Sequence, residues 1–385
     1  MKKISINFSR LFVGLLFIFS GLIKANDPLG FGYKLEEYLE VFHLSFLNDY
    51  ATEMAIFLCG LEVILGAALL LGIWSKKVIW GLLGLIVFFT FLTFYSAYFK
   101  VVTSCGCFGD AIPLTPWQSF GKDLILLAFI LILFIYRSEI HPFTKNKTLQ
   151  NVALVFITLM GFGFGVYTYR NAPFIDFLPY KVGANIPQLM KAPPGAPQDE
   201  YQIIYGLKNK KTGAQQQMTD KEYLKQEIWK DANWEIVGEP ERKLIKKGYE
   251  IKIKDLKITD ALGEDYTQFL LENPNYKLFI VAYNLSHTQE SALKNLNELA
   301  TRLGYEYGIA TVLLTSSSAV DALKISQKLG LDMPFFYADA VPLKSMVRAN
   351  PGVLLMKNGV VINKWHYRNV PAFEDLGEQY FKNQK

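Results

Sequence analysis

The sequence is poor in charge and in cysteine, and each shortage excludes a class of protein. Of its 385 residues 19% are charged and 51% are hydrophobic, with 3 cysteines and 4 histidines. So low a charge content excludes an intrinsically disordered chain. So few cysteines exclude a small secreted domain held together by disulfides. The sequence also contains no glycine-rich phosphate loop, no zinc-ligand spacing and no nucleophile elbow.

The excess of basic residues does not indicate nucleic-acid binding. The formal net charge is +5, but the lysines are dispersed in short groups such as residues 208–211 and 243–247. A nucleic-acid footprint would cluster them on one face, among aromatic side chains that stack on bases. We therefore expect no nucleic-acid partner.

The hydrophobic residues are distributed unevenly along the chain. Long apolar stretches lie before Pro179, whereas segments rich in lysine and glutamate follow it. The second part has about 200 residues, enough for one or two domains with a core of their own. The sequence therefore predicts an α-helical membrane bundle followed by a soluble α/β region.

Five apolar stretches approach the length of a membrane span. A bilayer core about 30 Å thick requires about 20 residues of helix. The stretches cover residues 8–23, 51–74, 78–99, 120–136 and 149–169. The first follows a basic start, as in a signal peptide, but it ends without a small-x-small cleavage site. We predict five transmembrane helices, with the lipid bilayer as a partner.

Basic residues beside these stretches predict the orientation of the helices. They precede or open the first, join the second to the third and join the fourth to the fifth, at Lys2, Lys3, Arg10, Lys76, Lys77, Arg137, Lys145 and Lys147. In five alternating helices all three positions fall on one side, which the positive-inside rule makes cytoplasmic. We expect a protein of the cytoplasmic (inner) membrane with a cytoplasmic N-terminus and a periplasmic, or extracytoplasmic, C-terminal region.

The loop after the first stretch predicts a helix at the membrane surface. Its apolar residues recur at three and four positions, at Leu35, Tyr38, Leu39 and Phe42. We expect this helix to cap the bundle rather than to gate a substrate. Charged residues near the ends of the stretches are expected to be interfacial anchors; these are Lys24, Asp27, Lys122 and Asp123.

All three cysteines lie in the membrane half. Cys105 and Cys107 belong to a Cys-Gly-Cys-Phe-Gly segment on the predicted outer side, and Cys59 lies inside the second stretch. A disulfide across one intervening residue closes a small ring with strained geometry, which suits exchange. Gly106 and Gly109 allow tight turns. A disulfide that only tightens the loop, a bridge from one of the pair to Cys59, and metal ligation are the alternatives.

Glu62 is the second unusual residue, because an ionisable side chain inside a membrane helix is costly and generally faces the bundle interior. It lies three residues after Cys59 and hence on the same helix face. If the Cys105 loop folds over that face, a carboxyl group can exchange the proton that accompanies thiolate chemistry. A packing hydrogen bond to a neighbouring helix is an equally good explanation. The candidate catalytic residues are Cys105, Cys107, Cys59 and Glu62.

Scattered residues of the first two stretches and the Cys-Gly-Cys loop together resemble a known family. They are Arg10, Gly14, Phe17, Ser20, Gly21, Lys24, Glu62, Gly66, Leu71, Gly72 and residues 105–109. This pattern resembles the DoxX and MauE group of four-helix membrane proteins, over roughly residues 1–137. The MauE branch is associated with maturation of disulfide-rich periplasmic enzymes. The resemblance implies thiol redox outside the cytoplasm and allows a quinone as cofactor, and it leaves the fifth helix as an addition.

From Tyr276 onward the sequence alternates between strand and helix patterns. We predict strands at 278–282, 309–314 and 334–337, helices at 288–303, 320–329 and 374–381, and a hairpin over 353–361 with an Asn-Gly turn. This order resembles the thioredoxin fold, a mixed sheet covered on both faces. Pro351 falls where that fold has its cis-proline.

The redox cysteines of that fold are missing. They belong after the first strand, where this sequence has residues 284–287, Asn-Leu-Ser-His. Ser286 and Gln289 instead predict a helix capping box. His287 is a weak catalytic candidate, since a lone exposed histidine is ordinary. We therefore expect this domain to bind a protein partner or to cover the membrane cysteines.

The connector between the two parts contains a proline-rich linker over 193–197, a hairpin around 208–213, a helix over 220–231 and a strand over 251–253. The predicted domains are residues 1–148, a four-helix membrane domain; 149–170, a fifth helix; 171–260, linker and connector; and 261–385, the thioredoxin-like domain.

The sequence is compatible with two functions. In the first, Cys105 and Cys107 exchange with extracytoplasmic protein thiols during redox or maturation of envelope proteins. In the second, the protein is a membrane scaffold or assembly subunit whose redox-inactive thioredoxin-like domain binds a protein partner. Whether the chain is an enzyme is left open by the sequence.

Overall fold

The structure is a computed structural model that describes residues 2–102, 106 and 108–382. Contacts divide the chain into two compact units. The first comprises residues 1–184 and 257–385, and therefore includes both the long apolar helices and the α/β sheet. The second comprises residues 185–256.

Five helices of the described residues are long and apolar enough to span a membrane. They are α1 (Lys2–Asn26), α3 (Ala51–Leu71), α4 (Ser75–Phe99), α5 (Pro116–Ile135) and α6 (Lys147–Asn171). Each contains one of the five predicted stretches to within three residues. Many of their large apolar side chains are exposed, as on Phe156 and Leu159 of α6. In a bilayer such side chains face the lipid rather than water.

Glycines let α1 approach α3 closely. A Cβ atom built on Gly66 would lie 2.8 Å from the carbonyl oxygen of Gly14, so the two backbones touch in the manner of small-residue membrane contacts. Near the end of α3, Arg10 donates hydrogen bonds from Nε to the Leu69 carbonyl at 2.9 Å and from Nη2 to the Leu70 carbonyl at 2.6 Å. The arginine thereby adds hydrogen bonds to carbonyls of the last turn of α3, where few backbone donors remain.

A shorter helix, α2 (Pro28–Val41), covers one end of the bundle and is followed by η1 (Ser45–Tyr50). The Asp27 side chain caps α2 by accepting from the Gly30 N–H at 2.9 Å. The apolar face of α2 packs in one cluster with side chains of α1 and α3, as the spacing of its leucines predicted. The cluster comprises Ala25, Phe31, Leu35, Leu39, Ala51, Ala55 and Cys59.

The α/β part is built on a five-stranded sheet of order β7-β6-β5-β8-β9. Its strands are β5 (Lys277–Val281), β6 (Ala310–Thr315), β7 (Phe335–Tyr337), β8 (Gly352–Lys357) and β9 (Val360–His366). Strands β5, β6 and β7 are parallel to one another, whereas β8 is antiparallel to β5 and β9 to β8. This is the mixed sheet that the sequence predicts for a thioredoxin-like domain.

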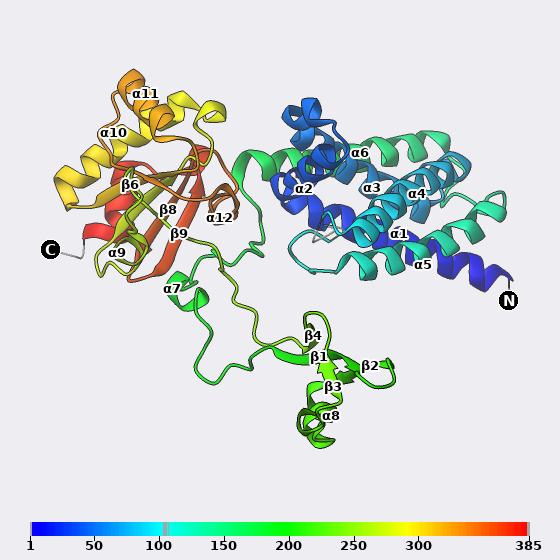
Figure 1. Cartoon of the computed structure of the whole chain (residues 1–385). Coiled ribbons are helices and arrows are strands. Elements are labelled where there is room, and N and C mark those ends of the chain that lie inside the picture. Colours follow the sequence, from blue (N-terminus) through cyan, green and yellow to red (C-terminus); the bar gives the residue numbers. More distant parts are fainter. Residues whose placement is uncertain (1, 103–105, 107, 383–385) are drawn as a thin grey trace. The chain divides into compact units, whose positions relative to one another are not determined.

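Helices accompany the sheet in the predicted order (Figure 1). They are α9 (Thr267–Leu271), η3 (Leu285–His287), α10 (Glu290–Tyr307), α11 (Ala319–Leu329), α12 (Ala340–Met346), η4 (Tyr367–Asn369), α13 (Phe373–Leu376) and the π-helical turn η5 (Gly377–Phe381). Leu278 and Ile280 of β5 pack with residues of α10, α11 and α13. The alternate residues Phe279 and Val281 are at most 1% exposed, so both faces of the sheet are covered.

Two turn predictions are confirmed and one cap prediction is wrong. The Asn350–Pro351 peptide is cis, and Asn358 and Gly359 have φ angles of 50° and 78° in the hairpin turn. The capping box of Ser286 and Gln289 does not form, because the Asn284 side chain accepts from the Ser286 N–H and starts a separate 3₁₀ turn. Helix α10 then begins without a side-chain cap.

The second unit contains α7 (Ile186–Leu189), β1 (Glu200–Asn209), β2 (Gln215–Thr219), α8 (Asp220–Lys225), η2 (Ile228–Lys230), β3 (Trp234–Ile236) and β4 (Glu241–Lys246). Strand β1 pairs with β2, β3 and β4, all antiparallel. The predicted hairpin is confirmed. The helix predicted over 220–231 ends at Lys225, and the strand predicted over 251–253 is absent from this described segment, where the chain runs without regular structure.

Candidate functional site

The centre of the bundle contains a buried ion pair. Lys24 of α1 and Glu62 of α3 are 3% and 2% exposed, and Lys24 Nζ donates to Glu62 Oε1. Gly21 allows this approach, because a Cβ on it would lie 3.1 Å from the Glu62 Cβ. Inside a membrane each charge stabilises the other, since neither can be solvated by water. The prediction that Glu62 faces the bundle interior is confirmed, but its chemical role stays a prediction.

A second charged pair lies beside the first. Asp123 of α5 is 1% exposed; its Oδ1 accepts from Lys122 Nζ at 2.6 Å and its Oδ2 from Thr93 Oγ1 at 3.1 Å. Lys24, Glu62, Lys122 and Asp123 line one small cavity of about 30 Å³. Glu62 Oε2 has no hydrogen-bond partner within the described part of the chain. The cavity has room for about one water molecule, and it does not fit the ring of a quinone.

The interpretation of these side chains as interfacial anchors is wrong for Lys24 and Asp123. Both lie close to a helix end, which is why the sequence places them at the membrane surface. Both nevertheless point inward and are buried. Distance from a helix end indicates depth, but the direction of the side chain depends on the helix face.

Cys59 is fully buried, at 0% exposure, beneath α2. Its backbone carbonyl would lie 2.9 Å from a Cβ on Gly21, so α1 packs directly against the turn that carries both Cys59 and Glu62. The prediction that these two side chains lie on one face of α3 agrees with their burial. An exchange role for Cys59 stays a prediction.

Cys105 and Cys107 lie outside the described residues, so their roles stay predictions. The neighbouring residues Gly106 and Gly109 have φ angles of 64° and 52°, and the Gly109 N–H donates to the Gly106 carbonyl at 3.0 Å. Left-handed backbone of this kind favours glycine, as the sequence predicted. A Cβ on Gly106 would lie 3.4 Å from Lys34 Cγ, which places this residue against α2.

A cavity of about 380 Å³ adjoins this segment. One side is lined by Gly106, Gly109 and Asp110, and another by Lys344 and Arg348 of the α/β domain. Helix α2 contributes a third side, with Phe31, Tyr33, Lys34, Glu36, Glu37 and Glu40. The cavity is therefore shared by the loop, the covering helix and the α/β domain, which are far apart in the sequence.

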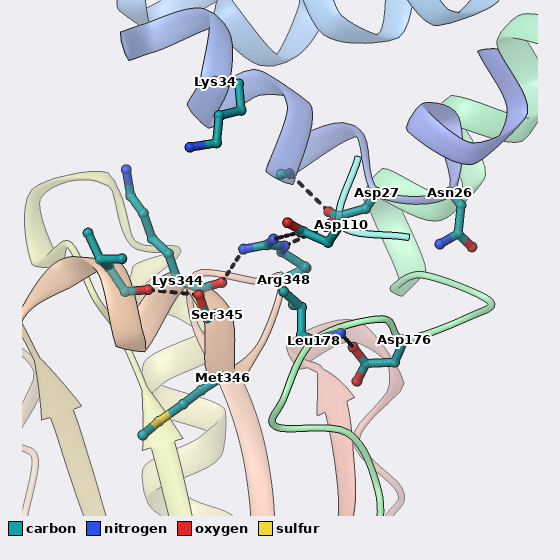
Figure 2. A network of polar contacts seen from close by, with 12 residues as sticks. Asn26, Asp27, Lys34, Asp110, Asp176, Leu178, Lys344, Ser345, Met346 and Arg348 are labelled. Atoms are coloured by element: carbon teal, nitrogen blue, oxygen red, sulfur yellow. Dashed lines mark hydrogen bonds and ion pairs between the residues drawn. The ribbon is translucent and has the colours of Figure 1, made fainter. Parts of the chain in front are cut away.

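Arg348 connects these parts, as Figure 2 shows. It is 7% exposed; its Nε donates to Asp27 Oδ2 at 2.7 Å, its Nη2 to Asp110 Oδ2 at 3.0 Å and its Nη1 to the Lys344 carbonyl at 2.6 Å. Burial disfavours the charged guanidinium, but the carboxylates of Asp27 and Asp110 outweigh it and raise the pKa of Arg348. Burial also raises the pKa of the Asp110 carboxyl, against the effect of Arg348.

Two tyrosines and a lysine extend this contact along α2. Tyr33 Oη donates to Tyr283 Oη at 2.9 Å, and the ammonium of Lys344 lies 4.0 Å from the centre of the Tyr33 ring. Lys344 also pairs with Glu36 at 3.3 Å. Tyr283 directly precedes residues 284–287, where a thioredoxin would carry its cysteines, and His287 there is exposed.

Sequence reasoning made no prediction for Arg348 and none for its contact with Asp27. Asp27 and Arg348 are 321 residues apart, and no periodic pattern reports such a contact. A weak signal was present, because Arg348 stands among the apolar residues Met346, Val347 and Ala349 shortly before the predicted cis-proline, and a charge that is buried there needs a partner. Among the described residues, no group of three His, Cys, Asp or Glu side chains is placed to hold a metal ion.

Comparison with known proteins supports a MauE-like membrane region together with a thioredoxin-like domain. Residues 2–136 match the model of the family described as methylamine utilisation protein MauE. A protein of Flavobacterium psychrophilum described as Protein TlpB is 28% identical over 156 residues, which is 39% of this chain and 41% of that relative. The aligned part thus spans about two fifths of the relative. The protein is a membrane protein in which a MauE-like membrane region, residues 2–136, is joined to a thioredoxin-like domain.

Proposed function

We propose that this protein performs thiol–disulfide exchange with extracytoplasmic proteins through Cys105 and Cys107. The observation that carries the proposal is the cavity of about 380 Å³ that Gly106, Gly109 and Asp110 line. It combines apolar residues such as Phe31 with charged ones such as Lys34 and Glu37. A site of this size and chemistry suits a short segment of a protein client.

The exchange balances without a further reagent. A thiolate of a client dithiol attacks the Cys105–Cys107 disulfide and forms a mixed disulfide, and the second client thiolate then displaces the protein's sulfur. The client loses two electrons and two protons and gains a disulfide, while the two cysteines become thiols. Run in reverse, the same step reduces a client disulfide. No step is assigned to a quinone, because the cavity beside Glu62 has room for about one water molecule.

Glu62 is proposed to hold a proton during exchange. Two features support this role: Oε2 has no hydrogen-bond partner within the described part of the chain, and it adjoins a water-sized cavity that Lys24 and Asp123 also line. A carboxyl group so placed can take up a proton without breaking its contact with Lys24 through Oε1. Cys59 is assigned a packing role, since it is fully buried among apolar side chains.

Trapping of mixed disulfides in intact membranes tests this proposal. Cys107→Ser leaves one thiol of the pair, and we expect it to accumulate adducts with client proteins that reductant removes. Cys105→Ser tests the other thiol, and Cys59→Ala is the matched control, expected to behave like the native chain. The proposal fails if neither single variant forms adducts and the Cys105→Ser, Cys107→Ser double variant leaves the redox state of envelope proteins unchanged.

A scaffold function is the second candidate, favoured by residues 284–287, which lack cysteine where the thioredoxin fold carries it. In that case the full-length double variant would still co-purify with the same protein partner as the native chain, and would support the assembly of that partner. Under the exchange proposal, partner capture depends on the two cysteines.

A further inference from the structure

The buried side chain of Arg348 lies at the centre of the contact between the thioredoxin-like domain and the MauE-like region. We propose that Arg348 is a positioning residue that latches the thioredoxin-like domain onto Asp110 of the Cys-Gly-Cys loop, so that the partner of this domain is the membrane region of its own chain. The importance of the latch for exchange rests on the proposed function, whereas the latch itself does not.

The thioredoxin-like domain holds Arg348 rigidly. The residue lies between α12 and the cis-proline Pro351, and its neighbours Val347 and Ala349 are each 2% exposed. Its Nη1 donates to the Lys344 carbonyl at 2.6 Å, one helical turn earlier. The backbone and one edge of the guanidinium are therefore held by the domain itself, and the other edge is presented to the membrane region.

The two carboxylates that Arg348 contacts come from different segments of the membrane region. Asp27 lies at the junction of α1 and α2, and Asp110 lies three residues after Cys107. Nε serves the first and Nη2 the second, at 2.7 Å and 3.0 Å. A planar guanidinium donates in several fixed directions, whereas a lysine ammonium is a compact charge that cannot reproduce this fork. The geometry thus explains the use of arginine.

Independent contacts support the same docking. The Tyr33–Tyr283 hydrogen bond and the Lys344–Glu36 ion pair join the domain to α2 at other points. Tyr283 and Arg348 precede the two segments, 284–287 and the cis-proline, that meet at one end of the thioredoxin-like sheet, where Asn350 Nδ2 donates to the Asn284 carbonyl at 2.7 Å. This end carries no cysteine, and its place against the membrane region accounts for a domain that cannot exchange thiols itself.

Hydrogen exchange of the full-length protein in lipid nanodiscs tests the latch. We expect Arg348→Gln to speed amide exchange about tenfold in peptides covering residues 106–115 and 28–41, because a charge-assisted contact is lost. Arg348→Lys should restore little of the protection. Peptides of strand β5 should be unchanged, which separates loss of docking from unfolding. Arg302→Gln is the matched control, since that exposed arginine pairs only with Glu374 of the same domain among its described salt bridges.

A double-mutant cycle provides the decisive comparison. Asp110→Asn alone should speed exchange in the loop, and the double variant with Arg348→Gln should be no faster than Arg348→Gln alone, since both remove one interaction. Fully additive effects, or a loop that exchanges at the native rate in Arg348→Gln, would overturn the latch. Neither readout involves thiols, so failure of client trapping with an intact cycle would refute the exchange function and leave the latch standing.

Discussion

The MauE-like region and the thioredoxin-like domain bury polar groups in opposite ways. The membrane region retains Lys24, Glu62 and Asp123 at 3% exposure or less, each with an oppositely charged partner. The sheet domain fills its central strand β5 with side chains such as Phe279 and Ile280, which are at most 1% exposed. His366 of the sheet domain is also buried, at 4% exposure, but it has no oppositely charged partner among the described salt bridges. The membrane region thus pairs its buried charges, whereas the sheet domain relies mainly on an apolar core.

Removing one partner of the buried pair would break this comparison most strongly. Glu62→Ala leaves the Lys24 ammonium buried without its carboxylate, and we expect a loss of about 3–5 kcal/mol in the free energy of unfolding. Replacing both, as Lys24→Met with Glu62→Leu, should recover most of that loss, because no charge is then buried. Thermal unfolding of the full chain in detergent measures both. Equal stability of the single and double variants would contradict the pairing.

Truncating an apolar side chain in the core of the sheet tests how much apolar burial stabilises the thioredoxin-like domain. Ile280→Ala removes buried methyl groups from the centre of β5 and should cost about 3 kcal/mol, through lost burial and the cavity that remains. Near-ultraviolet circular dichroism during denaturant unfolding reports the change. Val320→Ala, at a side chain 62% exposed in the same domain, is the control and should cost less than about 0.5 kcal/mol.

A titratable group in the sheet domain sharpens the comparison, because it is buried without an opposite charge. Burial, aided by Arg368, lowers the pKa of His366 from 6.5 to about 4. Below pH 6.5 the unfolded chain binds a proton that the folded one does not, so stability falls as the pH drops from about 6.5 to about 4, by up to about 3 kcal/mol.

The His366 effect is measured from the unfolding temperature of the full chain between pH 4 and pH 7. His366→Gln should flatten the profile in that window. His287→Gln is the matched control, since His287 is exposed, and it should leave the slope as in the native chain. A native profile without any slope between pH 4 and pH 6.5 would show that His366 does not titrate as its burial implies.

Local patterns predicted the elements of both regions, because apolar runs and turn residues act over a few positions. The five apolar helices, the succession of strands and helices after Tyr276 and the Asn358–Gly359 turn follow from such signals, whereas the cis-Pro351 was expected from the resemblance to the thioredoxin fold. The capping box at Ser286 failed because Asn284, two residues earlier, competes for the same backbone donor. Where two capping side chains are in reach, residue spacing alone does not predict which of them accepts from the backbone N–H.

The sequence by itself determined the five apolar helices that the described residues contain, that an α/β domain follows them, and that all three cysteines lie in the membrane half. Only the tertiary structure decided that Lys24 pairs with Glu62 across 38 residues and that Arg348 joins Asp27 and Asp110. The physical reason is that hydrophobic periodicity specifies which face of an element is buried. The partner that a buried charge meets is specified by packing between elements distant in the chain.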